Sequence, residues 1–209
     1  MKKRFLSIAI CLTLCLSAMF VFSACKKEKE PTEAEIANQQ MTSAFTNMLS
    51  QEAFKMEGLV EGQEMVMIYS EDALYYEMSM MGMAIQMWSI DGFDYTVMND
   101  GESSMYTKSA SEGDMFGDMT SVNKGATFVS SSTENGVLTL VFKDIEDDEN
   151  PYVVYTIENN LITSVEMQDA QRETTSTITI TYENVVVPAL PTEDGEGNPI
   201  EWIDSSLGE

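Results

Sequence analysis

The sequence contains no histidine. Histidine is the most common general base in enzymes and a frequent ligand of zinc and copper(II), so its absence excludes the Ser-His and Cys-His nucleophile systems and most sites for these metals. The sequence also has no glycine-rich phosphate loop and no Gly-x-Ser-x-Gly motif. We therefore predict that the protein is not an enzyme, with no catalytic residues, no cofactor and no metal site.

Basic residues are also scarce. The chain has 35 Asp and Glu but only 11 Lys and Arg, and its net charge is −24. An acidic surface of this kind repels the phosphates of nucleic acids and the headgroups of anionic lipids. We therefore expect no nucleic-acid partner.

The chain has one long apolar run, and it lies at the N-terminus. A basic start at residues 2–4 precedes an apolar stretch at residues 5–22, which ends in Ser23, Ala24 and Cys25. A positive start, an apolar middle and small residues at the end are the parts of a secretory signal. An uncleaved transmembrane anchor is the alternative, because the apolar run is close to spanning length.

The end of this run, Phe22-Ser23-Ala24-Cys25, resembles the lipobox of bacterial lipoproteins. The resemblance implies that residues 1–24 are a signal peptide, that Cys25 is lipidated, and that the protein is held on the cell membrane facing outside the cytoplasm. Residues 25–31 then form a charged tether. Since Cys11 and Cys15 would leave with the signal, the mature chain would have no disulfide.

Residues 32–191 carry the pattern of one domain. Apolar residues at helical spacing predict an amphipathic helix over Glu33–Leu49, with Thr32 and Glu35 at the spacing of a capping box. From residue 53 the apolar period changes to two, and turn signals recur along the chain. The predicted strands are residues 54–61, 64–69, 73–80, 84–90, 93–98, 103–108, 127–133, 137–143, 152–157, 161–168 and 174–182.

The links between these strands are short, and several contain Asp-Gly or Asn-Gly pairs that suit tight hairpins. The predicted fold class is therefore α+β, mostly β: a curved antiparallel meander or incomplete β-barrel of about eleven strands with one N-terminal helix. Residues 109–124 interrupt the pattern and predict a short inserted flap. Residues 184–191 are predicted to be an extended edge, and residues 192–209 a loose acidic C-terminal tail whose Trp202 and Ile203 dock on the domain.

This order of elements resembles the lipoprotein-carrier fold of the LolA and LppX type. The likeness also rests on short, mainly apolar segments that recur toward the end of the domain, namely Tyr155-Thr156-Ile157, Leu161-Ile162, Ile180-Thr181-Tyr182 and Val187-Pro188. The resemblance implies an incompletely closed barrel over residues 32–191 that binds lipids or other hydrophobic molecules.

Methionine is unusually abundant, with 17 residues and a dense cluster at residues 78–83. Methionine fills irregular cores, lines adaptable apolar cavities, or coordinates copper(I) through its thioether, and the sequence leaves these three roles open. Because alternate residues of a strand share a face, we predict that one apolar face of the first half of the sheet lines a ligand site. Its members are Met56, Met65, Met67, Tyr76, Met78, Met80 and Trp88.

The resulting functional prediction is a surface-anchored lipoprotein that binds or carries a lipid or another hydrophobic ligand. The alternative is a protein-interaction or sensor module of the cell envelope with a fully packed interior and no ligand. A further acidic stretch, residues 144–150, holds five carboxylates. It reads as a solvated loop, with a calcium site as the alternative.

Overall fold

The computed structural model describes residues 30–60, 62–80, 82–111, 126–144 and 149–205. The chain divides into two compact units, Met1–Thr32 and Glu33–Glu209. The predicted signal and Cys25, nearly all of the predicted flap, and the centre of the acidic loop lie outside the described residues. No helix in the described part of the chain combines the length and the hydrophobicity that crossing a membrane requires.

The predicted helix and all eleven predicted strands are present in the second unit, and each begins and ends within two residues of its predicted position. A short twelfth strand near the C-terminus was not predicted. In chain order the elements are α2 (Glu33–Leu49), β1 (Ala53–Val60), β2 (Gln63–Ser70), β3 (Ala73–Met80), β4 (Met83–Ile90), β5 (Phe93–Asn99), β6 (Ser104–Ala110), β7 (Thr127–Glu134), β8 (Val137–Lys143), β9 (Tyr152–Glu158), β10 (Leu161–Gln168), β11 (Thr174–Thr181) and β12 (Ile203–Asp204).

Tight hairpin turns connect most neighbouring strands. At Asp91-Gly92, between β4 and β5, φ is 53° and 78°; at Asn135-Gly136, between β7 and β8, it is 51° and 85°. Positive φ at both central residues is what a two-residue turn needs to match the right-handed twist of the strands, and Asn, Asp and Gly adopt it most readily. Turns of this kind fix the register of each hairpin locally.

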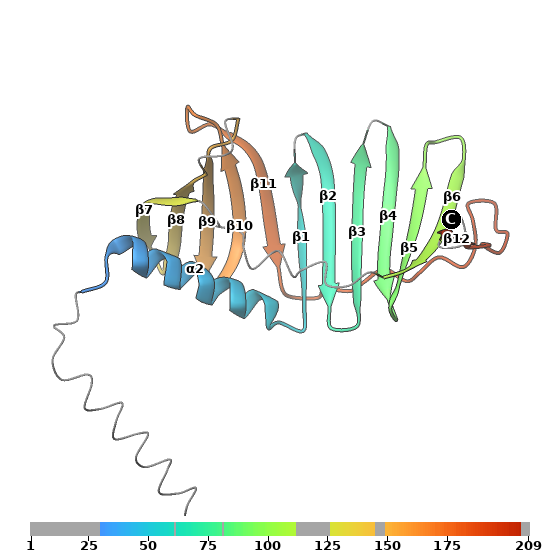
Figure 1. Ribbon diagram of the computed structural model, residues 1–209, viewed down its shortest axis with the longest axis horizontal. Helices are drawn as coiled ribbons and strands as arrows, with labels where there is room; N and C mark the ends of the chain where they lie inside the picture. The colour runs from blue at the N-terminus through green and yellow to red at the C-terminus, as the bar shows by residue number, and fades with distance from the viewer. Residues whose placement is uncertain (1–29, 61, 81, 112–125, 145–148, 206–209) are drawn as a thin grey trace, which may run out of the picture. The chain divides into compact units, whose positions relative to one another are not determined.

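The strands form one open sheet in the order β12-β6-β5-β4-β3-β2-β1-β11-β10-β9-β8-β7 (Figure 1). Two meanders, β1–β6 and β7–β11, are joined by antiparallel pairing of β1 with β11. The edge strands β7 and β12 are not paired with each other, so the sheet is curved but not closed into a barrel. The predicted fold class is confirmed.

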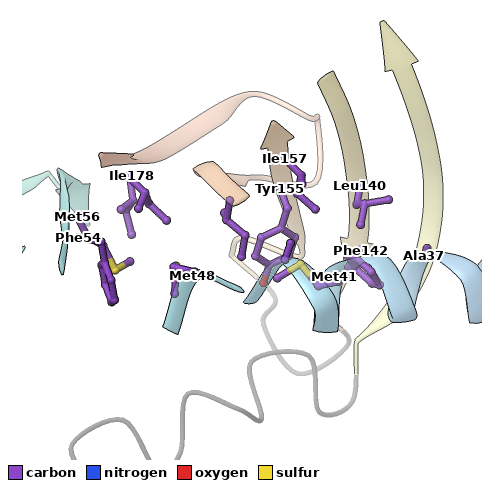
Figure 2. Packing of buried hydrophobic residues seen from close by; sticks show 13 residues of the cluster. Ala37, Met41, Met48, Phe54, Met56, Leu140, Phe142, Tyr155, Ile157 and Ile178 are labelled. Carbon is purple, nitrogen blue, oxygen red and sulfur yellow. The ribbon is translucent and has the colours of Figure 1, made fainter. Parts of the chain in front are cut away.

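One side of the sheet, which we call the helix side, carries α2. The helix runs across strands β7–β11 (Figure 1) and buries residues spaced by three and four along its length. Figure 2 shows Met41 and Met48 of the helix lying against aromatic and aliphatic side chains of the sheet. The fully buried members of this core include Phe54, Phe142 and Leu140, each with no exposed surface.

The opposite side, which we call the tail side, is covered over β2–β6 by the chain that follows β11. Val185, Val187 and Leu190 pack against a second core of Ile68, Tyr75, Trp88 and Val97. The prediction of an extended edge at residues 184–191 is therefore wrong: the apolar residues of this segment cover a sheet face instead of extending the sheet. Beyond it, the predicted docking of Trp202 is confirmed, since Trp202 packs on Tyr95 and Tyr106. Ile203 begins β12 beside β6, but its side chain is 61% exposed and does not dock as predicted.

Trp88 binds the chain that follows β11 to the sheet. Its indole Nε1–H donates a hydrogen bond of 2.9 Å to the carbonyl oxygen of Pro188, and its ring lies 5.0 Å from that of Tyr75. We expect Trp88→Phe to leave the Pro188 carbonyl without its donor and to lower the free energy of unfolding by about 1–3 kcal/mol. The segment at residues 185–202 should also become easier to cleave in limited proteolysis. Unchanged cleavage and stability would show that the hydrogen bond does not hold the segment.

Candidate functional site: the methionine face

The helix side of β2–β6 is the part of the sheet where methionine side chains gather. Residues paired across antiparallel strands point to the same side, so the register identifies the members of this face. Met65, Met78, Ile85, Met98 and Met105 are successive cross-strand partners, and they form one row across five strands. A second row contains Met67, Tyr76 and Met87, and Met80 pairs with Met83 at the end of the β3–β4 hairpin. We call these ten residues the methionine face.

Six of the seven predicted ligand-lining residues lie on the helix side. Five of them, namely Met65, Met67, Tyr76, Met78 and Met80, belong to the methionine face, as the two-residue step of a strand predicted. Met56 shares the side, but it is only 7% exposed and is a buried member of the core that α2 covers, against which Met65 and Met67 also pack.

The assignment of Trp88 to this face is wrong. Trp88 pairs with Tyr75 and Tyr95, which lie on the tail side, and it is 3% exposed within the core beneath the C-terminal segment. In β4 the residues on the helix side are the odd-numbered ones, Met83, Ile85 and Met87. These three residues were not predicted, although the tight β3–β4 turn would have located them opposite Met80, Met78 and Tyr76. Met98 and Met105 were not predicted either.

Most of the methionine face is half-buried, and its margins are open. Met80 is 36% exposed and Met105 is 45% exposed. The hydroxyl of Tyr76 donates a hydrogen bond of 3.2 Å to the sulfur of Met78. Because methionine has three rotatable bonds and a polarisable sulfur, such a surface adapts to apolar groups of different shapes. The chemistry available here is therefore the binding of apolar groups.

One charged residue shares this side of β2–β6. Asp94 lies on β5 opposite Ser89 and Ser109, and the register places its side chain on the helix side. Its Oδ1 atom is buried and has no hydrogen-bond partner among the residues that the structure describes. A buried polar atom without a partner lowers stability, so native proteins rarely keep one without a reason. No lysine or arginine lies on this side of these five strands, all of whose positions on this side are described.

The turns that border the methionine face are acidic. Glu71, Asp72 and Asp91 lie in the exposed turns at one end of the strands, and Asp100 and Glu102 lie in the exposed β5–β6 turn at the other. These carboxylates give the surroundings of the methionine face a negative potential.

Described residues also line two clefts elsewhere on the domain. One, of about 290 Å³, lies between the β5–β6 turn and the loop at Asp194 and is lined mainly by polar residues. The backbone amide of Ser103 lowers the pKa of Asp100, and that of Asn198 lowers the pKa of Asp194. The other, of about 370 Å³, lies beside the β9–β10 turn and the end of β11. Neither cleft is lined by any of the predicted ligand-lining residues.

Metal binding finds no support in the described part of the chain, where no three acidic or cysteine side chains gather as a metal site would require. The centre of the proposed calcium loop, residues 145–148, lies outside the described residues. Coordination of copper(I) by methionine stays one of the three roles that the sequence leaves open.

No protein-family model matches the sequence, and no curated protein matches it either. Solved structures of MucB are similar in part. A crystal structure of MucB is 12% identical, with 77% of this chain and 62% of that chain covered and a TM-score of 0.32. The Pseudomonas aeruginosa MucA/MucB complex is 12% identical, with 74% and 59% covered and a TM-score of 0.37. MucB in complex with MucA(peri) is 13% identical, with 79% and 62% covered and a TM-score of 0.35.

The chain thus spans about three fifths of the length of the MucB chains that it matches. Similarity at these TM-scores assigns the chain neither a family nor a function.

Proposed function

We propose that this chain is a lipid-anchored protein of the cell envelope that acts as a protein-interaction module, and that the methionine face is its binding surface. The observation that carries the proposal is the row formed by Met65, Met78, Ile85, Met98 and Met105. Large apolar patches that are exposed to solvent usually mark binding sites. The surface lies on a broad, regular sheet, which suits a partner with an extended contact area.

Anchoring is proposed from the N-terminal pattern alone. Two acyl chains on Cys25 would stabilise membrane attachment because each buried methylene contributes about 0.8 kcal/mol. We expect Cys25→Ala to move the protein from the membrane fraction to the medium, or to leave it unprocessed. Cell fractionation followed by intact mass measurement would detect both results.

Ala24→Gly is the matched control for this variant, because it keeps a small residue before the cysteine, and it should stay anchored. A Cys25→Ala protein that is cleaved normally and still sediments with membranes would overturn the lipid anchor.

The interaction surface can be tested in cells with a photo-crosslinking amino acid. It is introduced at Met105, at the open margin of the methionine face, or at Thr179, which is exposed on the tail side of β11. We expect a discrete protein adduct from position 105 and none from position 179. If the anchored, folded protein gives equal adducts at both positions, or none at either, the proposed surface is wrong.

A carrier of lipids or other hydrophobic molecules, as the LolA and LppX resemblance implies, is the second candidate. It is favoured by the soft, adaptable side chains of the methionine face. The same crosslinking experiment separates the two functions, since a carrier would give adducts of lipid mass at position 105. Introducing charge with Met78→Asp should abolish the uptake of an apolar fluorophore by a carrier, because a lone carboxylate is costly to bury in an apolar site.

A further inference from the structure

The domain itself shows how its sheet binds a helix. On the helix side, α2 lies across strands β7–β11 (Figure 1) and buries Ala37, Met41, Ala44 and Met48. On the same side of β2–β6, the described residues include no helix that packs in this way. The row from Met65 to Met105 crosses five strands, and four strand spacings amount to about 19 Å. About 13 residues of α-helix have that length.

The charges around this surface indicate which charge a bound helix should carry. The turns at both ends of β2–β6 carry exposed carboxylates, and the face has no cation of its own. An anionic membrane surface or an acidic helix would be repelled, whereas a segment with lysine or arginine beside its apolar stripe would be attracted. Methionine-rich apolar surfaces with acidic surroundings suit such basic amphipathic helices, since the thioethers adapt to different apolar side chains.

Asp94 supplies an independent observation that points the same way. Its Oδ1 atom is buried on the helix side, and no described residue donates a hydrogen bond to it. A lysine or arginine of a bound segment would donate to this oxygen, and a charge-assisted hydrogen bond of this kind is stronger than a neutral one.

We infer that the partner of the methionine face is a basic amphipathic helix, which lies across β2–β6 as α2 lies across β7–β11 and pairs a cationic side chain with Asp94. The inference rests on the proposed function and specifies the partner's chemistry. Contacts with the apolar row would then supply most of the affinity, and Asp94 would favour a partner with a positive charge.

The test uses the full chain carrying Cys25→Ala, purified from the medium, or extracted from membranes and freed of lipid if its signal is retained, so that no bilayer competes for the probes. The probes are three labelled helical peptides of about 18 residues, a length that covers the row. All three have leucine along one face, and the other face carries lysine, glutamine or glutamate. Fluorescence anisotropy should show the lysine peptide binding at least tenfold more tightly than the glutamate peptide.

Two variants assign the roles. The double variant Met78→Gln/Met98→Gln keeps the length and flexibility of both side chains but makes them polar, and it should weaken binding of the lysine and glutamine peptides at least tenfold. Asp94→Asn should weaken binding of the lysine peptide several-fold and leave binding of the glutamine peptide unchanged. The matched control is Glu134→Gln on β7, which removes one exposed charge far from the face along the sheet and should change neither. Circular dichroism would verify that each variant is folded.

The outcomes separate this inference from the proposed function. The basic helix is overturned if the lysine and glutamate peptides bind equally, or if Asp94→Asn weakens binding of the lysine and glutamine peptides equally. A protein adduct at position 105 would still support the interaction surface in either case. Flotation of the Cys25→Ala chain with phosphatidylglycerol vesicles, abolished by the double methionine variant, would overturn the inference in favour of a membrane surface. Loss of both peptide binding and the Met105 adduct would overturn inference and proposed function together.

Discussion

Replacing Gly58 by valine is expected to lower the free energy of unfolding by about 3 kcal/mol or more, and to give insoluble protein if the domain is only marginally stable. Gly58 lies on β1 opposite Ile178 of β11 and Met65 of β2. A Cβ atom at this position would overlap the Thr177 carbonyl oxygen and come within 2.9 Å of the Ile178 Cα. Both are backbone atoms, so the clash is relieved only if β1 and β11 move apart.

The effect should be large because β1 and β11 form the junction between the two meanders. Chemical denaturation of the variant would measure it. Gly195→Val is the matched control, since a Cβ at Gly195 meets nothing within 4 Å and its φ is not in the positive region. A Gly58→Val protein as stable as the Gly195→Val protein would contradict the close β1–β11 contact.

Phe54→Ala is expected to cost about 3–5 kcal/mol of folding stability. Phe54 has no exposed surface, and its ring lies 5.1 Å from that of Tyr69 and 6.5 Å from that of Tyr182. It belongs to the core in which Met48 of α2 meets the sheet. Removal of the ring therefore leaves a cavity at the point where the helix, β1, β2 and the chain after β11 come together.

Phe93→Ala provides the comparison, because Phe93 is 39% exposed on the tail side beside Lys108. Its loss should cost about 1 kcal/mol or less, since a partly exposed ring is removed from water only in part. The two variants can be compared by urea denaturation at equal m-values. Equal losses would mean that Phe54 is not a central packing residue.

Much of the local structure could be predicted from the sequence. Glu33–Leu49 alternates at the helical period, the strands alternate at the period of two, and the turns at Asp91-Gly92 and Asn135-Gly136 have the residues that positive φ requires. These signals act over a few residues, so chain neighbours alone produce them. The shared side of Met65, Met67, Met78 and Met80 followed from the same rules, because a tight turn sets the register of its hairpin.

Trp88 shows that the position along a strand, and not the residue type, decides which side of the sheet a side chain lies on. Trp88 is large and apolar, which suggested membership of the methionine face, but parity along β4 places it with Tyr75 on the tail side. A shift of one residue along a strand reverses the side of every side chain, so residue type is a poor substitute for counting from the turn.

The sequence by itself thus determined the helix, eleven of the strands, their hairpin pairings and the shared side of Met65, Met67, Tyr76, Met78 and Met80. Only the tertiary structure decided that β1 pairs with β11, that α2 covers β7–β11 and leaves the methionine face without a described helix, and that the chain after β11 crosses the tail side to Trp88 and Trp202. These contacts join residues a hundred or more positions apart, such as Trp88 and Pro188, or Lys55 and Thr181. No local period or turn encodes such pairings, because they depend on which apolar surfaces remain unburied once the hairpins have formed.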